Sequence, residues 1–247
     1  MIEFKEVYKS FGSKRVLNGV STTIREGEIT YIIGASGTGK SVLVKHIVGH
    51  ILPDKGQVLV DGVDVTTLDE KGLYELRKKA ALVFQMSALF DSMTLAENVA
   101  LPLRVHRKLR KKEAVKEALK YLEMVQMEEM ADVFPSQVGP SLQKRVSIAR
   151  SLTLNPKYAI LDEPTTGLDV IAAANVDSMI QRLNRELGVT VIVVSHDLRS
   201  IFGVADRILF LYKGNVYMDG TAREFLESQD PLVRQFISGS PEGPMET

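Results

Sequence analysis

Residues 34–41 read Gly-Ala-Ser-Gly-Thr-Gly-Lys-Ser and match the pattern G-x-x-x-x-G-K-[ST] at every fixed position. Glycines in such a loop adopt backbone conformations that side chains forbid, so successive N–H groups can point at a polyphosphate. The Lys40 side chain can reach the β- and γ-phosphates, and the Ser41 hydroxyl can coordinate Mg²⁺. We therefore predict that a nucleotide binds along this loop, which consists of Gly34, Ala35, Ser36, Gly37, Thr38, Gly39, Lys40 and Ser41.

The segments on either side of the loop have the pattern that this motif requires. Ile29–Ile33 is an apolar, β-branched run typical of a buried strand, and residues 41–48 are typical of a helix. The N-terminus of that helix would add its partial positive charge to the phosphate site. A chance glycine-rich turn would lack this context, so the sequence favours a nucleotide site.

Carboxylates follow a second predicted strand, over residues 158–161. Asp162 and Glu163 come directly after it, where parallel sheets bind their ligands. Asp162 can hold Mg²⁺ through water, and Glu163 can polarise an attacking water molecule as a general base. An isolated Asp-Glu pair is usually a solvated turn, but its position after a buried strand favours a functional role.

Two further polar residues end predicted strands. His196 follows the strand at 190–194 and can hydrogen-bond a γ-phosphate oxygen or the attacking water. Gln85 ends the strand at 80–84, and its amide can ligate Mg²⁺ or orient water. Without the other motifs, both would be interpreted as ordinary structural or surface residues.

Strand and helix patterns divide the chain into segments. Short strands dominate up to residue 86, a helical pattern extends over 87–155, and strands and helices alternate over 156–237. We predict an α/β fold: a parallel sheet with helices on both faces, an N-terminal antiparallel β lobe and an inserted helical subdomain at 87–155. The nucleotide-binding core would combine 1–86 with 156–237 in a single domain of 247 residues, with an irregular tail at 238–247.

Composition excludes several kinds of protein. Lys plus Arg and Asp plus Glu both number 31, so the basic surface that binds nucleic acid is missing. Cysteine is absent, which excludes disulfides and thiolate metal sites. No apolar run approaches the roughly 20 residues that span a bilayer, and the N-terminus lacks the pattern of a signal peptide. We expect any membrane-spanning part to be another chain.

Taken together, these motifs resemble the ATP-binding subunit of ABC transporters over residues 1–237. The loop at 34–41 and the segment 158–162 match the two Walker motifs, and Gln85 matches the Q-loop glutamine. The resemblance implies further roles: Glu163 as catalytic glutamate, His196 as switch histidine and Lys40 as phosphate ligand. It also implies adenine stacking on Phe11 near Val16, a D-loop at Gly167-Leu168-Asp169, and metal ligation by Ser41, Gln85 and Asp162. The implied assembly is a head-to-tail homodimer that closes on two ATP molecules.

One motif departs from the family pattern. Where that family has Leu-Ser-Gly-Gly before the conserved glutamine region, this chain reads Val138-Gly139-Pro140-Ser141-Leu142-Gln143. Gly139 lacks the hydroxyl and Pro140 lacks the N–H that would contact the γ-phosphate held by the partner subunit. We predict weaker dimer closure or slower turnover. The alternative is that Ser141 restores the contact after a small shift, with Gly139, Ser141 and Gln143 still lining the nucleotide.

Three segments resemble one branch of the family, the Mla/Mkl-type ATPases of bacterial MCE lipid-transport systems. They are residues 39–49, 87–94 and 233–239 together with Gly243-Pro244. The resemblance implies a permease that docks against 87–94, an MCE-domain lipid-binding protein and a small accessory subunit. It also implies peripheral attachment at the cytoplasmic face of the inner membrane, and a tail that contacts the neighbouring ATPase subunit.

Several alternatives remain open from the sequence. The chain could serve a polar amino-acid or metabolite importer, or act as an ATP-binding regulator with attenuated hydrolysis. An ABC protein acting on ribosomes or DNA is disfavoured by the single core and the zero net charge. The basic run at 104–112 is either a solvated loop and helix start or a surface attracted to anionic lipid headgroups.

Overall fold

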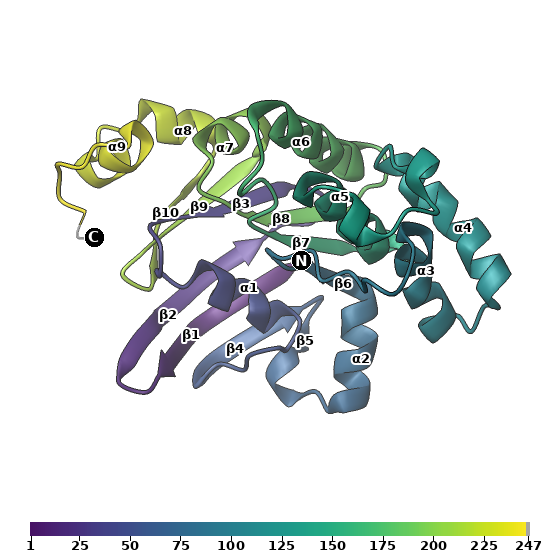
Figure 1. The fold of residues 1–247 in the computed structure, drawn as a ribbon. Coiled ribbons are helices and arrows are strands. Elements are labelled where there is room, and N and C mark those ends of the chain that lie inside the picture. Colours follow the sequence, from purple (N-terminus) through teal and green to yellow (C-terminus); the bar gives the residue numbers. More distant parts are fainter. Residues whose placement is uncertain (246–247) are drawn as a thin grey trace. The chain divides into compact units, whose positions relative to one another are not determined.

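The computed structural model describes residues 1–245 of the chain. Backbone contacts separate it into two units: unit 1 contains Met1–Leu73 and Ile192–Thr247, and unit 2 contains Tyr74–Val191. The division falls inside helix α2 (Glu70–Lys79) and inside strand β8 (Thr190–Val194). Figure 1 labels the elements, and the two units are described in turn.

The smaller sheet belongs to unit 1 and has the strand order β2-β1-β4-β5. Its strands are β1 (Ile2–Phe11), β2 (Lys14–Ile24), β4 (Lys55–Val60) and β5 (Val63–Asp64). All of its pairings are antiparallel, with Phe4 opposite Thr22 on β2 and Val58 on β4. Ile2 and Phe4 are buried while their neighbours are more exposed, so one face of β1 packs into the core. The predicted antiparallel β lobe is confirmed.

The larger sheet has the strand order β10-β9-β3-β8-β7-β6. In unit 1 it contains β3 (Ile29–Ile33), β9 (Arg207–Tyr212) and β10 (Asn215–Gly220). Strands β3 and β9 are parallel, and every residue of β3 is buried, as expected for a strand covered on both faces. Strand β10 is antiparallel to β9, which the sequence had not predicted. The reversal is a two-residue turn at Lys213 and Gly214, both with positive φ.

The helices of unit 1 are short. They are α1 (Lys40–Ile47), η1 (Val65–Thr67), α7 (Leu198–Val204), α8 (Ala222–Glu227) and α9 (Pro231–Ser238). Beyond α9 the tail turns back on the same helix: Gln235 Nε2 donates to the Ser240 carbonyl at 3.3 Å, and the Met245 N–H donates to Gln235 Oε1 at 2.6 Å. The last two residues of the predicted tail at 238–247 lie outside the described residues.

Unit 2 combines the remaining strands with most of the long helices. Its elements are β6 (Ala80–Val83), β7 (Tyr158–Asp162), α3 (Leu95–His106), α4 (Lys111–Met124), α5 (Pro140–Leu152), α6 (Val170–Arg185), η2 (Glu128–Met130) and η3 (Pro135–Gln137). Strands β6 and β7 are parallel. A capping box starts α3, since Thr94 Oγ1 accepts from the Glu97 N–H at 3.2 Å and the Glu97 carboxylate accepts from the Thr94 N–H at 3.0 Å.

No helix within residues 1–245 is both long and apolar enough to cross a bilayer. The boundaries of the predicted helical subdomain are not tested by the division into units, so that segmentation stays a prediction.

Candidate active site

Unit 1 contains the glycine loop, between β3 and α1. Gly34, Gly37 and Gly39 have φ values of 145°, 78° and 100°, which side chains rarely tolerate. A Cβ at Gly34 would lie 2.3 Å from the Leu211 carbonyl oxygen, and one at Gly39 would lie 2.8 Å from Leu17. Glycine is therefore required at Gly34 by the Leu211 backbone as well as by its conformation, and at Gly39 mainly by its positive φ.

Lys40 stabilises the loop from inside. Its ammonium donates to the carbonyls of Gly34 at 2.8 Å and Ala35 at 3.0 Å, and the residue is only 8% exposed. Helix α1 begins after Gly39 with no side-chain cap, so its first turn presents backbone N–H groups at the loop. This arrangement suits a bound anion.

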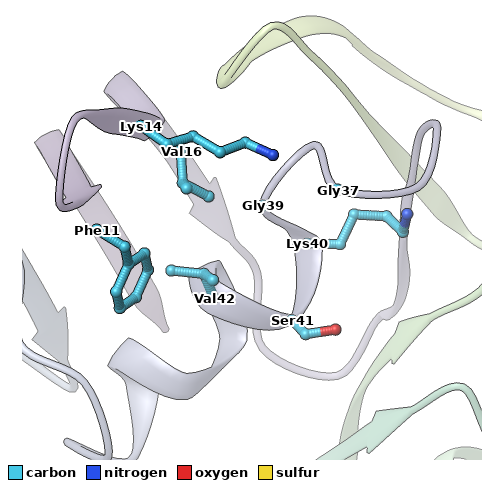
Figure 2. Close-up of a pocket in the computed structure, with 8 residues that line it drawn as sticks. All are labelled: Phe11, Lys14, Val16, Gly37, Gly39, Lys40, Ser41 and Val42. Carbon is cyan, nitrogen blue, oxygen red and sulfur yellow. The ribbon is translucent and has the colours of Figure 1, made fainter. Parts of the chain in front are cut away.

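A pocket of about 340 Å³ lies against the loop. Its lining residues are Phe11, Lys14, Val16, Gly37, Gly39, Lys40, Ser41 and Val42. Figure 2 shows Phe11, Lys14 and Val16 on one side and the loop on the other, with the Lys14 side chain extending towards the glycines. Lys14 was not predicted, although it lies in the sequence between two residues that were. An aromatic ring next to a phosphate-binding loop has the composition of a nucleotide site.

Hydrogen bonds with Asp54 fix the end of β1, which carries the Phe11 ring. The Asp54 N–H donates to the Tyr8 carbonyl at 2.8 Å, and the Asp54 carboxylate accepts from the Ser10 N–H at 2.7 Å and from Lys9 Nζ at 2.8 Å. The hydrogen bond from Lys9 is the largest influence that lowers the pKa of Asp54. Lys9 Nζ also lies 5.6 Å from the centre of the Phe11 ring, a cation–π contact.

His196 follows β8 at the same edge of the unit 1 strands as the glycine loop. The Ser195 N–H donates to the Ile32 carbonyl at 3.4 Å, so the end of β8 lies beside the end of β3. Asp197 caps α7 by accepting from the N–H groups of Arg199 and Ser200. His196 is exposed between them.

Unit 2 places the predicted carboxylates at the end of β7. Asp162 is 7% exposed, and Glu163 is half-buried with a φ of 53°, in the left-handed region. The Thr166 hydroxyl donates to Glu163 Oε2 at 2.8 Å. This hydrogen bond orients the carboxylate, and nothing in the sequence pattern indicated Thr166.

Lys144 connects helix α5 with the Q-loop. Its ammonium donates to the carbonyls of Gln85 and Phe84, and the residue is 4% exposed. Burial lowers the pKa of Lys144, whereas the negative charges of Asp162 and Glu163 raise it. The Gln85 side chain itself is exposed. Lys144 was missed because its partners lie about 60 residues away in the sequence.

The segment 138–143, which departs from the family's signature motif, forms a regular helix start. Gly139 is the N-cap of α5 with φ −70° and ψ 164°, and Pro140 occupies the first helical position, where its missing N–H would have no helical partner. The side chain of Gln143 donates to the carbonyls of Pro135 at 2.9 Å and Val138 at 3.1 Å, which fixes the preceding loop. Near the D-loop, Asp169 caps α6 by accepting from two backbone N–H groups at 2.9 Å.

The predicted metal ligands are divided between the units: Ser41 is in unit 1, and Gln85 and Asp162 are in unit 2. Hydroxyl, amide and carboxylate oxygens are the hard donors that Mg²⁺ prefers, so the donor chemistry fits that ion. The joint arrangement of the three remains a prediction.

Comparison with known proteins decides the family. The family model described as ABC transporter matches residues 17–166, more than half of the chain. The chain belongs to the ABC transporter family. This ABC protein binds ATP, with Mg²⁺ as the accompanying cofactor, and its hydrolysis energises transport.

Individual relatives cover nearly the whole ABC protein. The Mycobacterium leprae protein mkl, named a probable ribonucleotide transport ATP-binding protein, is 36% identical over 244 residues, 99% of this chain and 70% of mkl. The MlaF protein of Haemophilus influenzae, named an intermembrane phospholipid transport system ATP-binding protein, is 36% identical over 245 residues, 99% of this chain and 93% of MlaF. The predicted resemblance to Mla/Mkl-type ATPases is therefore confirmed.

The fold is that of solved ABC cassettes. A dimeric structure of MJ0796 bound to ADP and Pi matches with a TM-score of 0.83 and 34% identity, covering 90% of this chain and 99% of MJ0796. The predicted fold class is confirmed.

Proposed function

We propose that this chain is the ATP-hydrolysing subunit of a transporter that moves phospholipid, and that it works as a head-to-tail homodimer beneath a separate membrane permease. The observation that carries the proposal is the glycine loop with Lys40 inside it and Phe11 across the pocket. The cargo is inferred from the MlaF relatives, and the dimer from the dimeric MJ0796 cassette.

In unit 1, the base of ATP would stack on Phe11 and the phosphates would lie along the loop. Lys40 would exchange its bonds to the Gly34 and Ala35 carbonyls for β- and γ-phosphate oxygens. His196 would donate a hydrogen bond to the γ-phosphate from the end of β8. Ser41 in this unit would hold Mg²⁺, and Gln85 and Asp162 are the unit 2 residues proposed for the same ion, which would supply positive charge to the phosphates.

In unit 2, Glu163 would accept a proton from the attacking water. The water oxygen forms a bond to the γ-phosphorus while the bond to the bridging oxygen of ADP breaks. The Thr166 hydroxyl, which donates to Glu163 Oε2 at 2.8 Å, would orient the carboxylate for this task. Asp169 and the start of α5 would face the nucleotide bound by the second copy of the chain.

Helix α5 would keep part of the phosphate contact that the family resemblance implies for residues 138–143. No hydrogen bond involves the N–H groups of Ser141 and Leu142 within residues 1–245, so both remain available to an anion. Gly139 offers no hydroxyl, and the result we expect is ATP-driven closure that occurs but is weaker than with serine.

The permease would dock against residues 87–94, which directly follow Met86. Asn98 is fully buried and bonds the backbone of Phe90, Met93 and Thr94, and Arg150 donates to the carbonyls of Ser87 and Ala88. These contacts fix the segment while Met86 and Phe90 stay 81% and 51% exposed. A rigid segment with exposed apolar side chains suits a protein partner.

The wider assembly follows from the same resemblance. An MCE-domain lipid-binding protein would receive or supply the cargo, with a small accessory subunit bound to the ATPase. This chain would be held peripherally at the cytoplasmic face of the inner membrane.

The test is to isolate the complex through an affinity tag on this chain and measure ATP turnover beside Glu163→Gln. We expect turnover that the variant abolishes, and phospholipid among the extracted molecules. Ribonucleotide in place of lipid would favour the function named for mkl and refute the phospholipid proposal. An absence of turnover in the intact complex would refute hydrolysis and favour an ATP-binding regulator.

A further inference from the structure

The turn between α3 and α4 has a dense positive charge that the nucleotide site does not use. Six of the nine residues at 104–112 are basic and none is acidic, although the whole chain has no net charge. All six are exposed. They are Arg104, Arg107, Lys108, Arg110, Lys111 and Lys112. We name this segment, 104–112, the basic turn.

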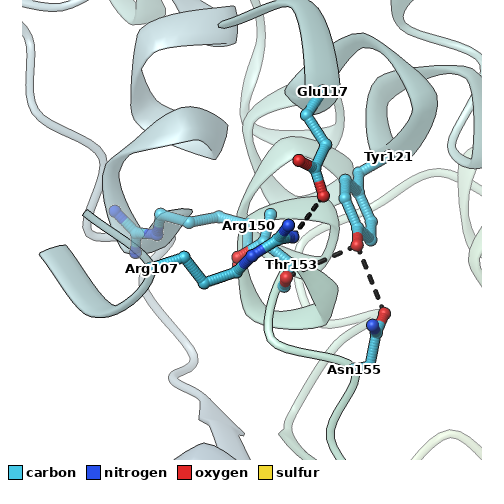
Figure 3. A network of polar contacts seen from close by, with 6 residues as sticks. All are labelled: Arg107, Glu117, Tyr121, Arg150, Thr153 and Asn155. Atoms are coloured by element: carbon cyan, nitrogen blue, oxygen red, sulfur yellow. Dashed lines mark hydrogen bonds and ion pairs between the residues drawn. The ribbon is translucent and has the colours of Figure 1, made fainter. Parts of the chain in front are cut away.

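Two of the basic residues anchor the turn to its own helices. Arg107 pairs with Glu117 on α4, and Lys111 pairs with Glu97 on α3. Four residues after Glu117 on α4, the Tyr121 hydroxyl donates to Asn155 Oδ1 at 3.2 Å (Figure 3). This hydrogen bond also fixes helix α4. The basic turn is therefore held in place at both ends.

The other four basic side chains are not held by ion pairs in the part of the chain that the structure describes. Within residues 1–245, no ion pair involves Arg104, Lys108, Arg110 or Lys112. Arg104 lies close enough to Glu97 to help lower the pKa of that carboxyl, after the larger effect of the hydrogen bond from Lys111. The remaining three cations, Lys108, Arg110 and Lys112, leave a net positive field at the surface of the turn. Such a field attracts anions within about 10 Å at ordinary salt.

A ring contact brings part of α2 to the same surface. His106 stacks on Tyr74 with ring centres 4.9 Å apart. Lys78 and Lys108 both lower the pKa of His106, after the larger effect of burial, so both cations lie near the ring. Lys78 pairs with Glu75, whose charge raises the pKa of His106, so α2 adds a ring contact to the basic turn but no net positive charge.

Apolar side chains lie among these cations. Val105 is 47% exposed, and Leu109 is half-buried between Lys108 and Arg110. Figure 1 shows α3 and α4 side by side and joined at one end by this turn. Cations that surround an exposed apolar side chain match the interface of an anionic bilayer, where headgroups neutralise the charge and the boundary accepts the apolar atoms.

We propose that the basic turn binds the surface of an anionic membrane directly, in addition to any permease contact. The inference goes beyond the proposed function because it concerns a surface separate from the nucleotide pocket. The full chain would be attracted to phosphatidylglycerol-containing membranes without a permease present. Loss of one cation should weaken binding about fivefold.

The test is flotation of the full chain with vesicles of phosphatidylcholine alone or with about one third phosphatidylglycerol. We expect binding to the anionic vesicles only, decreasing as salt increases. The variant Lys108→Gln/Arg110→Gln/Lys112→Gln should bind about 100-fold more weakly, from three steps of about fivefold. Its ATP turnover in detergent should be unchanged. A loss of vesicle binding by this variant can therefore be distinguished from a loss of ATP hydrolysis.

The matched control removes three exposed cations elsewhere, with Lys5→Gln/Lys71→Gln/Arg185→Gln. Retained vesicle binding in this control supports the proposal. Equal losses in the two triple variants would overturn it, because overall charge alone would then account for binding. Equal binding to neutral vesicles would also overturn it, as would tighter binding to single-stranded nucleic acid than to anionic vesicles.

Discussion

Replacing Gly139 by serine restores the missing hydroxyl at the start of α5, and the structure indicates that the change is tolerated. The residue has φ −70° and ψ 164°, which any amino acid adopts, and a Cβ there would meet no atom within 4 Å. Gly139 is also an N-cap without a side-chain hydrogen bond. A serine hydroxyl could accept from the N–H of Ser141 or Leu142.

The size of the effect follows from two contributions. The cap itself gains a few tenths of a kcal/mol over glycine, and removing glycine restricts the unfolded chain. Together they should raise the free energy of unfolding by about 0.5–1 kcal/mol, which for a chain of this size raises Tm by about 1–4 °C. With ATP, a hydroxyl bonded to the partner's γ-phosphate should tighten dimerisation by about tenfold or more.

The assay combines thermal unfolding without nucleotide with ATP turnover and ATP-dependent dimerisation. Gly203→Ser is the matched control, because Gly203 lies exposed in α7, its Cβ would be unhindered, and serine should stabilise that helix by about 0.5 kcal/mol. The control should not alter turnover. A lower Tm for Gly139→Ser would refute the N-cap interpretation, and a higher Tm with unchanged dimerisation and turnover would refute the idea of an attenuated signature.

Three further predictions concern other sites. Burial lowers the pKa of His46 below 6.5, so the unfolded chain binds the proton more readily than the folded chain. The free energy of unfolding should therefore fall as pH decreases below about 6.5. Urea unfolding should show a smaller change of this free energy with pH in His46→Gln than in the wild type. Asn98→Ala should cost about 2–4 kcal/mol, since a fully buried side chain loses four hydrogen bonds, and should reduce copurification of the permease. Thr166→Val should lower kcat several-fold and leave the KM for ATP unchanged, and Thr166→Ser should restore kcat. Equal kcat values for Thr166→Val and the wild type would show that the hydrogen bond to Glu163 is dispensable.

Much of the nucleotide-binding fold could be predicted because its signals are local. The strand at Ile29–Ile33, the glycine loop and the following helix lie next to one another in the sequence, and each has its own pattern. The capping box at Thr94 is equally local. Helix α2 was missed because it contains Gly72, and only Leu76 is buried along its length, so it has no apolar stripe.

Two of the residues that sequence analysis missed, Lys144 and Lys14, act on parts of the chain that are distant in the sequence. Lys144 bonds carbonyls about 60 residues away, and Lys14 enters the pocket only because β1 and β2 place it opposite the loop. The left-handed backbone of Glu163 has no sequence signal, since glutamate is not a residue type that favours positive φ. These features depend on tertiary packing, which periodicity does not encode.

The measurement that tests the central claim most directly is ATP turnover by the complex isolated through this chain, with Glu163→Gln measured in parallel and bound lipids identified by mass spectrometry. We expect turnover in the wild type, its loss in the variant, and retained phospholipid in both. Turnover that survives Glu163→Gln, or a complex that hydrolyses ATP but holds no phospholipid, would contradict the account.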